Sequence, residues 1–203
     1  MLQVSNLSVA RGGISLLHDV SFSVQPGQAL VLRGANGIGK TSLLRCIAGL
    51  QQPISGTISG SETVAYAAHA DGLKGQLSVL ENLKFWSEVY GGPAPKSALA
   101  AYDLQELAQR SAANLSAGQK RRLGLARMLV TGCGLWVMDE PTVSLDAQNV
   151  ALFRIVLQAH LQSGGAAVLT THIDLDLSGE NLDLTGYIAT AQRSSSTFEE
   201  ALE

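Results

Sequence analysis

A glycine-rich loop between an apolar run and a helical pattern constrains this chain more than any other feature. The loop, GANGIGKT at 34–41, fits the pattern G-x-x-x-x-G-K-[ST]. The run 28–32 before it is typical of a short strand, and apolar residues at helical spacing follow over 40–50. Backbone N–H groups of such a loop point at phosphate oxygens, and the helix amino terminus adds partial positive charge. The sequence therefore predicts a strand, a phosphate-binding loop and a helix.

Two residues of this loop predict the chemistry of a nucleoside triphosphate. Lys40 would bridge the β- and γ-phosphates, and Thr41 would offer its hydroxyl to Mg²⁺. The metal ion neutralises the charge that develops as the γ-phosphoryl group leaves. The alternative, an ordinary glycine turn, is disfavoured by the strand and the helix on either side.

Two carboxylates follow a second apolar run. Residues 135–138 are typical of a buried parallel strand, Asp139 and Glu140 come at its carboxyl end, and Pro141 stops it. We expect Asp139 to lie beside the metal and Glu140 to act as the general base that takes a proton from the attacking water. Alone, such a segment is usually a solvated loop, but together with the phosphate loop it predicts a hydrolytic site.

The other patterns predict an α/β core. Residues 2–10 and 16–24 alternate at period two around Arg11-Gly12-Gly13, which predicts an antiparallel hairpin. The run 166–169 predicts another buried strand, and 146–162 has a helical pattern.

The middle of the chain is predicted to be helical. Between Pro53 and Leu115 the pattern changes to helices, and Ser78 with Glu81 has the spacing of a capping box. After two prolines a second helix is predicted over 96–110. The fold class is α/β: a phosphate-loop core with a mixed, mainly parallel sheet, an N-terminal antiparallel β subdomain, and a helical subdomain inserted over roughly 70–128. We expect 1–203 to be one domain that ends in a frayed tail over 193–203.

Composition narrows the class of protein. Lys and Arg number 14 against 17 Asp and Glu, so no basic field favours nucleic acid. Charged residues are 15% of the chain, against about 25% in an average domain, which favours a face covered by other subunits, although a compact Ala-rich monomer would look the same. Neither a spanning helix nor a secretory signal is predicted, so we expect the chain in the cytoplasm. Cys46 and Cys133 are expected to be buried thiols.

A second helix start carries a serine and a glycine. Leu115-Ser116-Ala117-Gly118-Gln119 precedes a helical pattern, and Ser116 with Gln119 again has capping-box spacing. The segment is either a helix start alone or a second phosphate-binding surface.

Taken together, these motifs resemble those of the ATP-binding subunits of ABC transporters, whose signature is close to LSGGQ and here reads LSAGQ at 115–119. Order and spacing match over nearly the whole chain, including WVMDEP at 136–141, Asp146 and His172. The resemblance implies ATP with Mg²⁺ and two copies arranged head to tail. Each nucleotide would lie between the loop of one copy and Ser116 and Gly118 of the other. His172 would hydrogen-bond the γ-phosphate and orient water near Glu140, and Asp146 would pass information between the two sites. The expected nucleotide-binding set comprises Arg11, Gly34, Ala35, Asn36, Gly37, Ile38, Gly39, Lys40, Thr41, Ser42, His69, Ser116, Gly118, Gln119 and Asp146.

Two positions depart from the family pattern. Most members place an aromatic ring under adenine where this chain has Arg11, whose guanidinium plane can also stack on a base. Most have a glutamine that touches Mg²⁺ and water where this chain has His69, whose charge depends on pH. The alternative is a site weakened for hydrolysis, which the presence of Lys40, Asp139 and Glu140 disfavours.

A narrower resemblance concerns the stretches 67–86 and 115–127 and the short length. They are similar to the ATP-binding subunits of bacterial cytochrome c maturation. This implies a peripheral ATPase on the cytoplasmic face of the inner membrane, docked on membrane-spanning subunits and driving haem export or release of a haem-loaded chaperone. The alternatives are another small bacterial exporter ATPase and a non-hydrolysing, ATP-dependent dimerisation switch. We expect the membrane-facing groove over 69–90, with Phe85 and Trp86 either exposed there or buried in the core.

Overall fold

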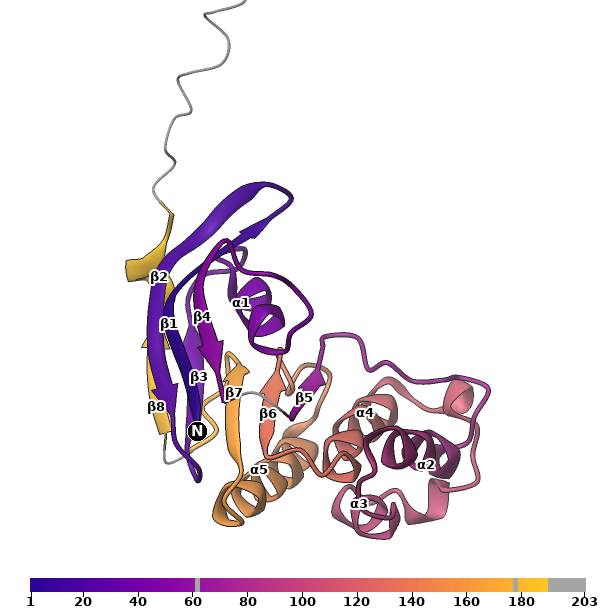
Figure 1. Ribbon diagram of the computed structural model, residues 1–203. Helices are drawn as coiled ribbons and strands as arrows, with labels where there is room; N and C mark the ends of the chain where they lie inside the picture. Colours follow the sequence, from indigo (N-terminus) through magenta and orange to yellow (C-terminus); the bar gives the residue numbers. More distant parts are fainter. Residues whose placement is uncertain (61–62, 177–178, 190–203) are drawn as a thin grey trace, which may run out of the picture.

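The computed structural model describes residues 1–60, 63–176 and 179–189, so the tail expected over 193–203 lies outside the described residues. The amino-terminal part forms an antiparallel sheet of β1 (Leu2–Arg11), β2 (Ile14–Val24) and β4 (Ser55–Ser59), in the order β2-β1-β4 (Figure 1). The predicted hairpin is confirmed. Its two-residue turn, Gly12 and Gly13, has φ of 57° and 82°, and two successive positive φ angles match the right-handed twist of a hairpin.

The second sheet carries the predicted parallel core. Its strands are β3 (Ala29–Arg33), β5 (Val64–Ala67), β6 (Leu135–Met138), β7 (Ala166–Thr170) and β8 (Gly179–Asp183), in the order β5-β6-β7-β3-β8. Each neighbouring pair is parallel, so the carboxyl ends of β3, β6 and β7 meet at one edge. Within the described residues the antiparallel strands thus form a sheet of their own.

The central strands are buried on both faces. Side chains alternate across a strand, so Trp136 and Met138 of β6 join a core with α5 (Ala147–Gln162), while Leu135 and Val137 join a core with α1 (Lys40–Ile47). This double burial explains why these strands are continuous apolar runs in the sequence.

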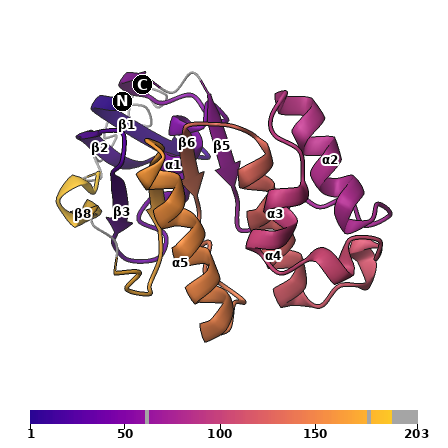
Figure 2. The same cartoon turned by 90° about the horizontal axis from the view of Figure 1, so that it is seen from below.

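Three helices gather on one side of the molecule, away from the antiparallel sheet (Figures 1 and 2). They are α2 (Val79–Tyr90), α3 (Lys96–Ala101) and α4 (Ala117–Val130). Short 3₁₀ turns lie at η1 (Gln105–Leu107), η2 (Ala112–Asn114) and η3 (Leu184–Tyr187). The capping box predicted for α2 forms, because the Ser78 hydroxyl accepts from the Glu81 N–H and the Glu81 carboxylate accepts from the Ser78 N–H.

Two secondary-structure predictions for the middle of the chain are wrong. The helix expected over 96–110 ends at Ala101, and Asp103 takes a left-handed φ of 51° that a continuous helix does not allow. The stretch from Pro53, expected to be helical, contains β4 and β5 before α2 begins. Their stability comes from pairing with β1 and β6, which local sequence does not reveal.

The two cysteines are buried free thiols, as expected. Burial raises the pKa of Cys46 to about 11, which keeps that thiol protonated at neutral pH. In the ranges that the structure describes, no helix has the length and apolar character to cross a membrane.

Candidate functional site

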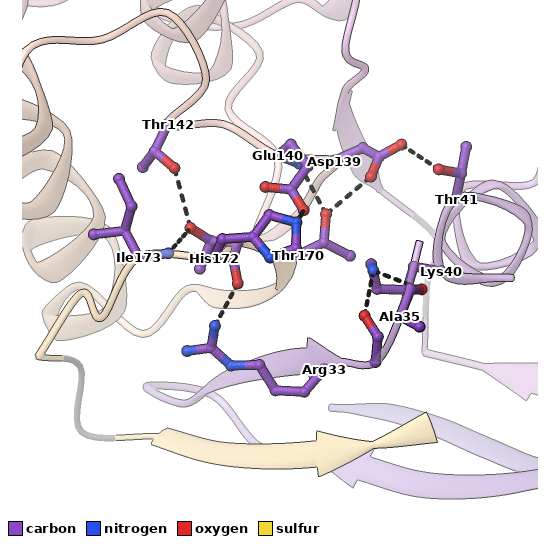
Figure 3. Close-up of polar contacts among 12 residues, drawn as sticks. Arg33, Ala35, Lys40, Thr41, Asp139, Glu140, Thr142, Thr170, His172 and Ile173 are labelled. Carbon is purple, nitrogen blue, oxygen red and sulfur yellow. Dashed lines mark hydrogen bonds and ion pairs between the residues drawn. The ribbon is translucent and has the colours of Figure 1, made fainter. Parts of the chain in front are cut away.

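The phosphate loop connects β3 to α1 and leaves the start of that helix open. Gly39 occupies the cap position with φ of 119°, and no side chain of the described residues caps α1. Lys40 Nζ folds back and donates to the carbonyl oxygens of Gly34, at 2.6 Å, and Ala35, at 3.1 Å (Figure 3). The N–H groups at the start of α1 are therefore free to bind an anion.

A cavity of about 340 Å³ lies over the loop, within the size range of ligand pockets. It brings together half of the predicted residues, namely Arg11, Asn36, Gly37, Gly39, Lys40, Thr41, Ser42, Asp139 and Glu140, and Ile14 and Leu16 form two further parts of its wall. Ala35 and Ile38 line a neighbouring pocket. Ile14 and Leu16 share one face of β2 by strand alternation, the signal from which they could have been predicted.

Asp139 lies at the end of β6 and is 6% exposed. Its Oδ2 accepts from the Thr41 hydroxyl at 2.7 Å, and its Oδ1 accepts from the Thr170 hydroxyl at 2.9 Å. Among the described residues no Lys, Arg or His forms an ion pair with it. Burial raises the pKa of Tyr66 to about 12, and the charge of Asp139 adds to that effect. A buried carboxylate beside a hydroxyl, without a cationic partner, is a donor set that fits Mg²⁺.

Glu140 and His172 face each other beside this cavity (Figure 3). The distance from His172 Nε2 to Glu140 Oε1 is 3.2 Å, and the Glu140 side chain is 17% exposed against 65% for His172. The resemblance to ABC transporter subunits implied that His172 acts near Glu140, and the two side chains do lie together. The Glu140 backbone has φ of 49°, and its N–H donates to the Thr170 hydroxyl at 2.8 Å.

The loop that carries His172 is fixed on two sides. Arg33, the last residue of β3, donates through Nη1 to the Thr171 carbonyl and through Nε to Asn181 Oδ1. The Thr171 hydroxyl lies 3.0 Å from that of Thr142 and accepts from the Ile173 N–H. Sequence reasoning missed Arg33, Thr142, Thr170 and Thr171. The position of Thr170 at the carboxyl end of β7 is a signal from which that residue could have been predicted.

Besides Ala35 and Ile38, several predicted residues do not line the cavity within this single described chain: Gly34, His69, Ser116, Gly118, Gln119, Asp146 and His172. Ser116 and Gln119 instead close the predicted capping box at the start of α4. Asp146 caps α5 by accepting from the Asn149 N–H at 2.8 Å. His69 lines a separate pocket of about 180 Å³ with Asp71, Lys120 and Ser144.

The aromatic residues of α2 are neither fully exposed nor in the core. Phe85 and Trp86 are half-buried; Lys74 lies over the first ring and Arg127 over the second. Val89 and Tyr90 at the end of the helix are 59% and 43% exposed.

Comparisons with known proteins show what the whole chain is similar to. The ABC transporter family model matches residues 17–143. A protein of Cereibacter sphaeroides, named cytochrome c biogenesis ATP-binding export protein CcmA, is 60% identical over 93% of this chain and 90% of its own. A protein of the same name from Ruegeria pomeroyi is 57% identical over 93% of both chains. A solved ATP-binding subunit of an ABC transporter is 26% identical, with a TM-score of 0.79 over 85% of this chain and 80% of its own.

The chain therefore belongs to the ABC transporter family of ATP-binding subunits, and within it to the group of the CcmA relatives. It binds nucleotide and is an ATPase. The predicted fold class is confirmed by the two sheets and by the likeness to the solved subunit.

Proposed function

We propose that this chain is the ATP-hydrolysing subunit of a transporter complex for cytochrome c maturation, and that hydrolysis drives haem export or release of a haem-loaded chaperone. The observation that carries the ATPase part is the pairing of Glu140 with His172 beside Asp139 and the phosphate loop. The names of the relatives at 57% and 60% identity support the transport part.

The phosphates of ATP would lie over the open start of α1. Lys40 would leave the Gly34 and Ala35 carbonyls and turn to the β- and γ-phosphates, since its ammonium already lies at the mouth of the loop. Arg11, on the wall formed by the β1–β2 hairpin, would stack on the adenine.

Thr41 and Asp139 would hold Mg²⁺. Their oxygens already lie 2.7 Å apart, and the buried Asp139 has no cationic partner within the part of the chain that the structure describes. When bound, the ion supplies charge neutralisation at the phosphates. Thr170 keeps the second oxygen of Asp139 oriented.

Glu140 would take the proton of the attacking water, because its carboxylate lies at the cavity wall and is not bonded to Thr41. His172 would hold that carboxylate and hydrogen-bond the γ-phosphate, and Arg33 and Thr142 would keep the His172 loop in place.

A second copy would complete each site in a head-to-tail dimer. Ser116, Gly118, Gln119 and Asp146 lie outside the cavity of their own chain, which fits a role in the site of a partner. We propose that the helical subdomain, roughly 70–128, docks on membrane-spanning subunits through 69–90, where Val89 and Tyr90 are exposed. The chain would then lie on the cytoplasmic face of the bacterial inner membrane.

The variant Glu140→Gln tests the chemistry. We expect ATP turnover to fall at least about 100-fold while ATP affinity stays within about threefold, since the amide keeps the shape and cannot accept a proton. Glu180→Gln, at an exposed glutamate of β8, is the control and should leave turnover unchanged. Full turnover by Glu140→Gln would remove the base assignment.

The transport part is tested by purifying the tagged chain from its own cells in mild detergent. We expect subunits of cytochrome c maturation to be recovered with it, identified by mass spectrometry. Recovery of unrelated permease subunits would keep the ATPase chemistry and overturn the cargo.

A further inference from the structure

Glu140 is held in an unfavourable backbone conformation by contacts at both of its peptide groups. Its φ of 49° lies in the left-handed region, which is unfavourable for a residue other than glycine. The N–H of Glu140 donates to the Thr170 hydroxyl at 2.8 Å, and its carbonyl accepts from Arg121 Nη2 at 2.6 Å. These two contacts fix the direction in which the side chain leaves the backbone, and the contact with His172 then holds the carboxylate.

Arg121 makes this contact from the second turn of α4, and it is 4% exposed. Its Nε donates to the Pro141 carbonyl at 3.0 Å, next to the bond to Glu140. A buried guanidinium with donors along one edge fixes two successive carbonyl groups in a way that an ammonium, a single point charge, does not.

The other side of the same guanidinium holds the segment after β5. Nη1 donates to Asp71 Oδ1 at 2.9 Å and to the Ala68 carbonyl at 3.1 Å, on either side of His69. Asp71 approaches α4 closely because Gly124 has no side chain: an added Cβ would lie 2.8 Å from Asp71 Oδ1. Glycine inside a helix is less favourable than alanine, so this close approach is kept at the expense of helix stability.

We propose that Arg121 is a positioning residue of the ATPase: it fixes the Glu140 peptide and couples it to residues 68–71, the segment that carries His69. The inference rests on the proposed role of Glu140 as base. A displacement of 68–71, such as a docked partner would cause, is transmitted through one buried side chain to the catalytic carboxylate.

The variants Arg121→Lys and Arg121→Met test this in the full chain with its membrane partners. We expect kcat to fall about tenfold for Arg121→Lys and more for Arg121→Met, because the paired hydrogen bonds to the backbone carbonyls of Glu140 and Pro141 are lost. The Kd of ATP should stay within about twofold, because the phosphate loop is unchanged. A structural defect alone would reduce the amount of folded protein and leave kcat per folded chain unchanged.

Arg122→Met is the matched control. Arg122 is the next residue of α4, its side chain is 14% exposed against 5% for Arg121, and it donates to the carbonyls of Tyr102 and Asp103, which are outside the site. It should lower stability without changing kcat. If Arg121→Met does not fold, Arg121→Lys decides the question alone.

Two outcomes overturn the proposal: unchanged kcat in a folded Arg121→Lys, or an equal loss of kcat in Arg122→Met. Glu140→Gln, measured in parallel, distinguishes the role of Glu140 as base from the positioning role of Arg121. An active Glu140→Gln contradicts the base assignment itself, whereas an inactive Glu140→Gln with a fully active Arg121→Lys contradicts only the positioning role. An Arg121–Asp71 double-mutant cycle in kcat should be non-additive, since both side chains share one contact.

Discussion

The amino termini of α1 and α4 are both proposed to bind phosphate, yet they are built in opposite ways. At α1 the cap is Gly39 and no described side chain satisfies the first N–H groups, whereas at α4 Ser116 and Gln119 bond to each other's backbone. The α1 terminus lines the cavity over the phosphate loop of its own chain, and the α4 terminus lies outside that cavity. The first N–H groups of α1 therefore need a ligand to complete their hydrogen bonds. Those of α4 already have hydrogen-bond partners in the capping box, so that terminus can wait for the nucleotide that a partner chain brings.

The largest effect is expected at the open terminus. Lys40→Met removes the ammonium that the loop carbonyls now hold, and we expect turnover to fall about 100-fold or more, with weaker ATP binding. Lys96→Met is the control, because Lys96 is likewise the first residue of a helix but is exposed on α3. Turnover by Lys40→Met equal to that of the control would contradict the proposed contact with phosphate.

A smaller effect is expected at the capped terminus, where α2 offers a matched pair. Ser78→Ala and Ser116→Ala each remove the serine of a complete capping box and should each cost about 1 kcal/mol of stability. Only Ser116→Ala should also reduce turnover, since its hydroxyl is proposed to reach the nucleotide of a partner chain. Thermal unfolding and ATP turnover of both variants make the comparison, and equal turnover in the two would place Ser116 outside the site.

The smallest expected effect is a difference between the two capping boxes in how their contribution to stability depends on pH. Hydrogen bonds from the Ser78 backbone and side chain lower the pKa of Glu81 below its usual 4.5, so the unfolded chain takes up a proton first as pH falls. The stabilisation is complete above the unfolded pKa and is lost as pH falls through the folded pKa. Glu81→Gln should flatten the pH dependence of the melting temperature below about pH 4.5. The box at Ser116 uses Gln119, which does not titrate, so Gln119→Ala should leave that slope unchanged.

Most of the residues predicted for the site were found from short sequence motifs. Asp139, Glu140 and the loop follow directly after strands, so the parallel sheet brings them together as expected. Arg33 and Arg121 were missed because they act on backbone groups or on other side chains, and no spacing rule marks such contacts.

The fold was predictable where local pattern and burial agree. The doubly buried β6 and β7 were visible as apolar runs, but β4 and β8 were not, because four of the five residues in each are exposed. Pairing with β1 and β3 defines these two strands. The break at Asp103 was hidden for the opposite reason: the local pattern favours one long helix, and tertiary packing of the buried Tyr102 and Leu104 overrides it.

The neighbouring placement of β6, β7 and β3 has a consequence for how this molecule can vary. Asp139 and the phosphate loop follow β6 and β3, and Thr170 ends β7, which lies between them in the order β6-β7-β3. Hydrogen bonding keeps adjacent strands about 4.8 Å apart even when the loops change. The spacing of the strands therefore sets the distance between the Asp139 carboxylate and the phosphate loop. The helices α2 and α3 can therefore diverge to suit different membrane partners while the spacing of the reacting groups stays fixed.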